Sequence, residues 1–348
     1  MNVTDLSVMA LWGAATLYAI AMVAHAIRLA RVADQRAAAR VAVAAGSAAA
    51  PSGASAGASA GETGDAPAPA SSVRTGRASV AKPAGIARST TLVGAVLHGV
   101  GLITRGIDAG HAPWSNMYEY TISGSFFAVA VFLIVQRRRD IAFLGAGVTG
   151  FATVALGIAL TVLYADVSPL PPALQSYWLV IHVSIAVLVT GIFIVSFIAT
   201  ALQLMRDYRE EGELPVEGGP VRRAWRRWHN LLARSYDRAR WLEAVPSATS
   251  LEALSFRLNA VGFVLWTFTV MAGAVWAEHI WGRYWGWDPK EVWSFVIWVL
   301  YAAYLHARTT QGWAGRRSAW LAIAGFVALI MNFTVVNLYF QGLHTYAV

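Results

Sequence analysis

The strongest chemical signal in the chain is a tryptophan-rich segment, residues 276–293, which lies between two apolar stretches. It contains five tryptophans and one tyrosine, namely Trp276, Trp281, Tyr284, Trp285, Trp287 and Trp293. Trp and Tyr are common at membrane–water interfaces, but this density exceeds what an interface requires. Because Gly282 and Gly286 let the backbone approach closely, the segment predicts an aromatic surface for a flat ligand.

The end of this segment also carries the signals of a helix start. Asp288 can cap a helix, and Pro289 suits the first helical position, where its missing N–H is not needed. Glu291 can complete a capping box by reaching back to the backbone of the capping residue. The sequence therefore predicts that a helix begins at Asp288 and fixes the tryptophans that precede it.

Two pairs of histidines are candidate ligands, because their predicted depths in a membrane match. His98 and His306 fall in the inner half of the predicted spans, whereas His182 and His344 fall near the outer ends. Two neutral imidazoles that face each other can hold one haem iron axially. The alternative is that each histidine hydrogen-bonds to a neighbouring helix, because an unpaired ionisable group in lipid is unfavourable. We favour the ligand interpretation for the two pairs.

Other metal and redox chemistry is disfavoured by the composition. The chain has no cysteine, which excludes disulfides, cysteine-ligated zinc, iron–sulfur clusters and thiol catalysis, and the chain cannot itself be a c-type cytochrome. A zinc site is not favoured, because no carboxylate or third histidine lies at ligand spacing. The remaining histidines, His25, His111, His229 and His279, are expected to be interfacial or solvated.

The composition is that of an integral membrane protein. Of 348 residues 57% are apolar and 13% are charged, and the mean hydropathy is +0.51. We therefore predict an all-α, polytopic bundle of about eight transmembrane helices. They are expected at about 6–29, 90–107, 118–136, 141–164, 177–204, 256–279, 291–308 and 317–340.

The distribution of basic residues predicts the orientation of the bundle. In the eight-span arrangement, 24 of the 27 lysines and arginines fall in loops on one side. The positive-inside rule then places both termini and the tryptophan-rich segment outside. The net charge of +8 follows from this topology and from attraction to anionic lipid, and no nucleic-acid-binding module is evident.

These patterns predict five regions along the chain. The first is an N-terminal transmembrane helix, the second a disordered cytoplasmic linker rich in Ala, Ser, Gly and Pro, and the third a group of four spans. A basic cytoplasmic loop follows, with an amphipathic helix that is expected to lie on the inner leaflet. Three spans with the tryptophan-rich segment complete the chain. The bounds of the five regions are 1–30, 31–89, 90–205, 206–255 and 256–348.

From about residue 90 onward, the chain resembles the CcsA/ResC family (CcsB in actinobacteria) of System II cytochrome c biogenesis. The resemblance rests on Trp-Gly-x-x-Trp-x-Trp-Asp-Pro-Lys-Glu at 281–291, which is similar to the family's "WWD" signature. Segments around four histidines support it, at 97–119, 178–183, 304–308 and 342–346. Eight spans favour this family over other WWD proteins, which have fewer or many more.

The resemblance implies a set of functional residues. His98 and His306 would bind haem within the membrane. His182 and His344 would hold haem at the outer surface and, with Asp288, carry the catalytic role. Trp281, Trp285 and Trp287 would form the aromatic surface against which this outer haem lies. Lys290 and Arg283 could contact haem propionates or only water, and the sequence leaves this open.

The resemblance also implies the setting of the reaction. The ligand would be haem b, bound non-covalently, and the acceptor an apocytochrome c with a C-x-x-C-H motif. A ResB/CcsB-like membrane partner would complete the synthase in the bacterial plasma membrane, with the tryptophan-rich segment on the outer face. Three alternatives stay open: a haem transporter or chaperone without ligation activity, a b-type electron carrier, and a general transporter.

Overall fold

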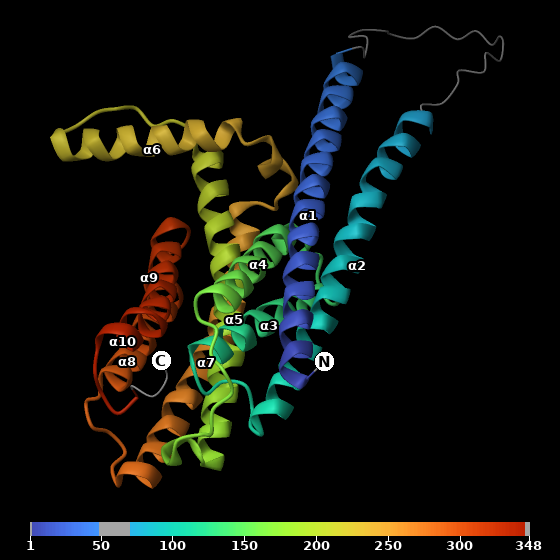
Figure 1. The fold of residues 1–348 in the computed structure, drawn as a ribbon. Helices are drawn as coiled ribbons and strands as arrows, with labels where there is room; N and C mark the ends of the chain where they lie inside the picture. Colours follow the sequence, from blue (N-terminus) through green and yellow to red (C-terminus); the bar gives the residue numbers. More distant parts are fainter. Residues whose placement is uncertain (1, 49–69, 345–348) are drawn as a thin grey trace, which may run out of the picture.

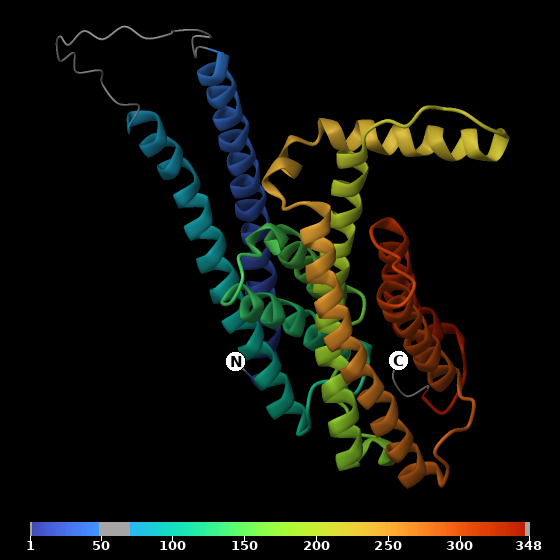
Figure 2. The ribbon, with the colours of Figure 1, turned by 180° about the vertical axis from the view of Figure 1, so that it is seen from behind.

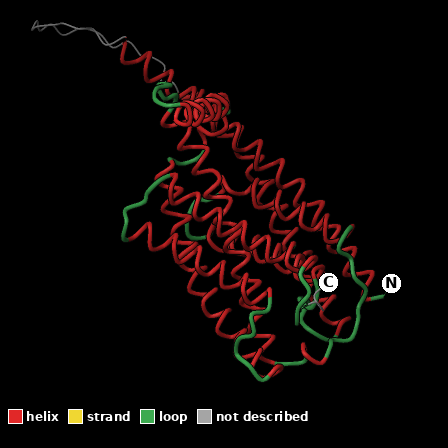
Figure 3. Tube along the Cα trace, turned by 90° about the vertical axis from the view of Figure 1, so that its left-hand side faces the viewer, coloured by secondary structure: helices red, strands yellow, loops and turns green. Residues whose placement is uncertain are grey.

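The computed structural model describes residues 2–48 and 70–344, and these residues form helices and loops without a strand (Figure 3). The ten α-helices of this described part are α1 (Val3–Ala48), α2 (Ala70–Ala109), α3 (Met117–Gln136), α4 (Gly145–Thr161), α5 (Tyr177–Glu211), α6 (Pro220–Arg238), α7 (Ala248–Trp281), α8 (Pro289–Thr309), α9 (Arg316–Phe333) and α10 (Val335–Tyr339). Three short 3-10 helices accompany them, η1 (Ala142–Leu144), η2 (Pro172–Leu174) and η3 (Arg240–Ala244).

The predicted polytopic membrane bundle is confirmed. Seven helices in the described chain are long and apolar enough to cross a membrane, namely α1, α2, α3, α4, α5, α7 and the α9–α10 segment. The expected span at 291–308 forms α8, which carries lysine, glutamate, histidine and arginine residues and is not among these seven helices. A helix bundle is the form that satisfies every backbone group inside a bilayer.

Helix α5 is the central element of the bundle. It packs against α7 along much of its length and against α3, while α1 packs against α2 and α4 (Figures 1 and 2). The core on the α7 side contains a stacked aromatic pair, in which the rings of Phe193 and Tyr301 lie 4.0 Å apart at 4°. Apolar and aromatic contacts of this kind hold helices together where lipid surrounds them.

The crossing of α3 and α5 depends on a glycine. A Cβ atom on Gly191 would lie 2.7 Å from the backbone carbon of Phe127 and 2.8 Å from the backbone nitrogen of Ala128. Small residues of this kind let two membrane helices approach to backbone contact. Gly191 therefore sets how closely α3 can lie against α5.

The prediction of a disordered linker at 31–89 is wrong at both ends of this range. Helix α1 continues to Ala48, and α2 begins at Ala70, so that only residues 49–69, which lie outside the described chain, separate them. Residues 31–48 are rich in alanine, the strongest helix former, so the helix continues beyond the predicted span. This extension also makes contacts, because Arg36 donates to the backbone carbonyl of Glu243 at 2.7 Å.

We predict that Gly191→Ala destabilises the protein, because its methyl group has no space between α3 and α5. Such overpacking costs about 1–3 kcal/mol. The measurement is thermal unfolding of the purified chain in detergent. Gly157→Ala is the matched control, since a Cβ on Gly157 of α4 would have no neighbour within 4 Å. Equal unfolding temperatures for both variants would contradict the assigned role of Gly191.

Candidate functional site

A cavity of about 500 Å³ is lined by residues near the start of α5 and near the end of α7. These helix ends lie at the end of the bundle opposite α6 (Figure 1). The walls of the cavity come from the start of α3, from α5 and α7, from the tryptophan-rich segment, from α9 and from the end of the described chain. Most lining residues are apolar, with a few polar groups among them. Volume and lining are those of a site for a largely apolar small molecule.

His182 projects from α5 into this cavity and is fixed by α7. Its Nδ1 lies 2.8 Å from the backbone carbonyl oxygen of Thr269, and a carbonyl can only accept, so Nδ1 carries the proton. The ring lies against the backbone of Gly273, where an added Cβ would come within 2.7 Å of the imidazole Cε1. The neutral ring therefore has its lone pair on Nε2, as a metal ligand requires.

His344 reaches the same cavity from the end of the described chain. Its Nδ1 lies 2.7 Å from Oδ1 of Asp288. A carboxylate acceptor keeps the proton on Nδ1 and the lone pair on Nε2, so this ring has the same tautomer as His182. The outer histidines, His182 and His344, thus line one cavity from separate elements, as the sequence predicts.

Asp288 is a shared acceptor for three parts of the site. It caps α8 through the backbone N–H of Lys290 at 3.0 Å, and the predicted capping box with Glu291 is present. Its Oδ2 accepts the backbone N–H of Leu343 at 2.6 Å. A Cβ on Gly342 would lie 2.3 Å from the same oxygen, so glycine is needed where the chain passes Asp288.

The charge of Asp288 is maintained by these contacts. Burial alone would raise the pKa of the carboxyl group, but hydrogen bonds from His344, Leu343 and Lys290 outweigh it and hold the pKa below its usual range. A carboxyl with a lowered pKa stabilises the fold when ionised, so its contribution is lost only as the pH falls through that lowered pKa. Asp288 is therefore an anion at neutral pH.

The three tryptophans that the resemblance assigns to the haem surface have different positions. The ring of Trp281 lies 5.2 Å from His344, and Trp285 lines the cavity. Trp287 is 77% exposed and contacts the edge of Trp285 at 5.9 Å, so it is an outer surface residue in this structure. Its positive φ of 59° turns the backbone into the helix start at Asp288.

Trp276 belongs to the predicted tryptophan-rich segment but is not among the tryptophans that the family resemblance places against the haem. It is 2% exposed, and its ring is parallel to that of His182 within 7° at 6.3 Å. The same ring lies 5.6 Å from His344. Trp276 falls both in the tryptophan-rich segment and at the end of the predicted sixth span, and its contact with both outer histidines appears only in the folded chain.

The structure does not bring His98 and His306 together. His98 is fully buried, with Nε2 2.9 Å from the carbonyl oxygen of Ile122 and Nδ1 3.3 Å from the hydroxyl of Tyr18. His306 is exposed on α8. Helices α2 and α8 lie on opposite sides of α5 and α7 in Figures 1 and 2. A single haem between these two histidines therefore stays a prediction that this arrangement does not support.

Two histidines that were expected to be interfacial or solvated are buried. His25 is 5% exposed and contacts the hydroxyl of Thr91 and the ring of Phe132. His229 is 1% exposed, and its Nε2 lies 3.1 Å from the carboxylate of Glu211. Both find polar partners on neighbouring elements, which sequence spacing does not reveal.

Comparison with known proteins agrees with this site. Residues 114–344 match the family described as Cytochrome C assembly protein. A curated relative, cytochrome c biogenesis protein CcsA of Synechococcus sp. (strain RCC307), is 36% identical over 253 residues, which cover 70% of this chain and 79% of that protein. The chain belongs to the CcsA/ResC family of System II cytochrome c biogenesis proteins.

Other relatives give the same result. CcsA of Synechococcus sp. (strain CC9605) is 35% identical over 271 residues, covering 76% of this chain and 87% of that protein. CcsA of Prochlorococcus marinus (strain MIT 9313) is 35% identical over 255 residues, with 70% and 79% covered. A role in cytochrome c biogenesis follows for this CcsA-family chain. The match to the family spans His182, Asp288 and His344 but begins after His98.

We predict that Asp288→Asn releases the end of the chain from α8. The amide of asparagine would put a donor where Asp288 now accepts from Leu343 or His344. A buried donor without an acceptor costs about 1–3 kcal/mol. Hydrogen exchange of the peptide that contains residues 340–344 is expected to speed up. Glu278→Gln, at a half-exposed pair with His279, is the control and should leave this exchange unchanged; unchanged exchange in Asp288→Asn would contradict the anchoring role.

Proposed function

We propose that this chain binds haem b in the outer cavity, with His182 and His344 as axial ligands, and presents it for thioether attachment to apocytochromes c. Haem and apocytochrome are the substrates of the process in which the family takes part. On this proposal the cavity end of the bundle faces outward from the bacterial plasma membrane. A ResB-like membrane partner supplies the remainder of the synthase.

The observation that carries the proposal is the meeting of two histidines from separate elements at one apolar cavity. In both rings Nδ1 donates to an oxygen acceptor, so the lone pair lies on Nε2. Partners of this kind orient a ligating imidazole and raise its basicity. The buried ring of Trp276 lies beside both imidazoles.

The charged groups at the cavity suit an apolar molecule with carboxylates. Among the residues that line it, Lys290 is the one lysine or arginine, and its Nζ donates to the backbone carbonyl of Asn332 at 3.0 Å. The lining carboxylate of Glu291 is already engaged by the backbone N–H groups of Gly286 and Asp288. An ammonium group at an apolar wall supports binding of a haem propionate.

The contribution of this chain to ligation is positioning. Haem supplies two vinyl groups, and each apocytochrome thiol adds its S–H across one of them. His182 and His344 would hold the iron, and Asp288 would fix the orientation of His344. Holding reacting groups in place can supply much of the acceleration of such a step. The tryptophans would shield the bound haem and leave its edge open to the acceptor.

We predict that His182→Ala and His344→Ala each reduce holocytochrome formation about tenfold or more, because loss of an axial ligand weakens haem binding. The measurement is haem-stained cytochrome c from cells that also express the ResB-like partner and an apocytochrome. His279→Ala is the matched control, since His279 hydrogen-bonds to its own helix and does not line the cavity. Added imidazole should partly restore both cavity variants.

The same experiment separates the alternatives. Wild-type protein that retains haem but yields no covalent product with partner and apocytochrome would indicate a haem transporter or chaperone. Haem that stays in the purified chain and cycles between redox states without transfer would indicate a b-type electron carrier. Full holocytochrome yield from both histidine variants without imidazole would contradict the proposal.

A further inference from the structure

Helix α6 is a feature that haem binding does not explain. It lies crosswise at the end of the bundle that is opposite the cavity, whereas the other long helices run along the bundle (Figures 1 and 2). Residues 220–238 do not qualify as a membrane span. The helix nevertheless exposes large apolar side chains: Val221, Trp225 and Trp228 are 83%, 52% and 61% exposed.

These apolar side chains share one face of α6. They are spaced by four and three residues, which places them on one stripe of an α-helix. Arginines flank the stripe, and Arg222, Arg223 and Arg227 are exposed. A helix with an apolar stripe, bulky tryptophans and an arginine-rich polar face is typical of peptides that lie in the surface of a membrane.

The side of α6 opposite the stripe contacts another segment of the chain through Asn230. The segment 212–219 runs along the side of α6 that is farther from the bundle (Figure 1). Asn230 accepts from the backbone N–H of Leu214 and donates to its carbonyl, both at 2.8 Å. Asn230 follows Val221 by nine residues, or two and a half helical turns, so it faces the opposite way. The apolar stripe is therefore turned back toward the level where the membrane spans end.

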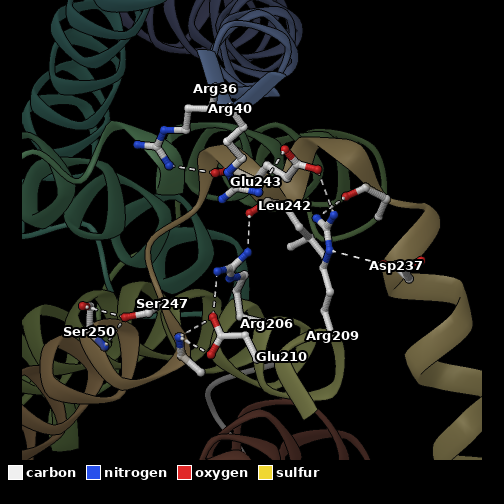
Figure 4. Close-up of polar contacts among 12 residues, drawn as sticks. Arg36, Arg40, Arg206, Arg209, Glu210, Asp237, Leu242, Glu243, Ser247 and Ser250 are labelled. Atoms are coloured by element: carbon white, nitrogen blue, oxygen red, sulfur yellow. Dashed lines mark hydrogen bonds and ion pairs between the residues drawn. The ribbon is translucent and has the colours of Figure 1, made fainter. Parts of the chain in front are cut away.

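Helix α6 is also fastened to the spans at its middle and near its C-terminal end. His229 contacts Glu211 at the end of α5, and Glu211 is in turn paired with Arg316 at the start of α9. Near the C-terminal end of α6, Arg209 of α5 lies 3.9 Å from Asp237 and 3.0 Å from Glu243 (Figure 4). The position of α6 relative to the bundle is therefore fixed by polar contacts, and the apolar stripe takes no part in them.

We propose that the apolar stripe of α6 is a binding surface for anionic lipid, seated in the leaflet at the end of the bundle opposite the haem cavity. The tryptophans enter the boundary between headgroups and acyl chains, and the flanking arginines contact lipid phosphates. Charge complementarity selects anionic headgroups, since each arginine near such a surface improves binding about fivefold. Lipid binding by α6 thereby stabilises the contacts of Glu211 with His229 and Arg316, which join α5 to α6 and α9.

The absence of cysteine from the sequence allows a single spin label to test this in the full-length chain. Val221→Cys places a nitroxide on the apolar stripe, and Arg223→Cys is the matched control on the polar face. The full-length protein is reconstituted in vesicles of phosphatidylcholine, with or without phosphatidylglycerol. Collision of the nitroxide with a water-soluble nickel chelate and with oxygen is measured by EPR, for variants that elute from size exclusion like the wild type.

With phosphatidylglycerol present, the label at 221 is expected to meet the nickel chelate about fivefold less often than the label at 223, and oxygen more often. Arg222→Gln/Arg227→Gln in the Val221→Cys background should reduce this protection. Equal access of nickel to both labels would overturn the proposal. Protection that is equal in phosphatidylcholine alone would overturn the preference for anionic lipid. Protection that appears only with a bound protein partner would reassign the stripe to that partner.

Discussion

Asp288 joins the start of α8 to the end of the described chain, because its two carboxylate oxygens accept hydrogen bonds from both. One oxygen accepts from the start of α8 and from His344, and the other accepts from Leu343. This carboxylate caps the helix start and anchors the end of the described chain beside the cavity. The tryptophan-rich segment, which ends at Asp288, depends on the same contact. The geometry of the outer site is thus maintained by one buried carboxylate that accepts three hydrogen bonds.

The bundle makes this arrangement possible because its two sides share α5. On one face α5 meets α3 at Gly191, where the backbones nearly touch. On the other face it meets α7, which supplies both the carbonyl that orients His182 and the indole of Trp276. A change in the α3–α5 or α5–α7 spacing would shift His182 relative to His344. The packing of α5 against its two neighbours therefore contributes to the precision of the site.

Some of this could be predicted from the sequence, because it depends on local patterns. The helical membrane class, the capping box at Asp288 and the gathering of His182 and His344 follow from hydropathy, from a four-residue signal and from matched depths. The role of Trp276, the outward position of Trp287 and the separation of His98 from His306 depend on which helices are neighbours, which spacing along the chain does not contain. The helical ends of the predicted linker lack apolar periodicity, and the helix propensity of alanine favours helix in the residues that extend α1.

The most direct test of the central claim is to identify the nitrogens that hold the iron. Pulsed EPR of the haem-loaded, purified chain with ¹⁵N-labelled histidine reports the histidine nitrogens bound to low-spin ferric iron. The account predicts two such nitrogens in the wild type and in His98→Ala/His306→Ala, and their loss in His182→Ala/His344→Ala. Two histidine nitrogens that persist in His182→Ala/His344→Ala would contradict it and place the haem elsewhere in the bundle.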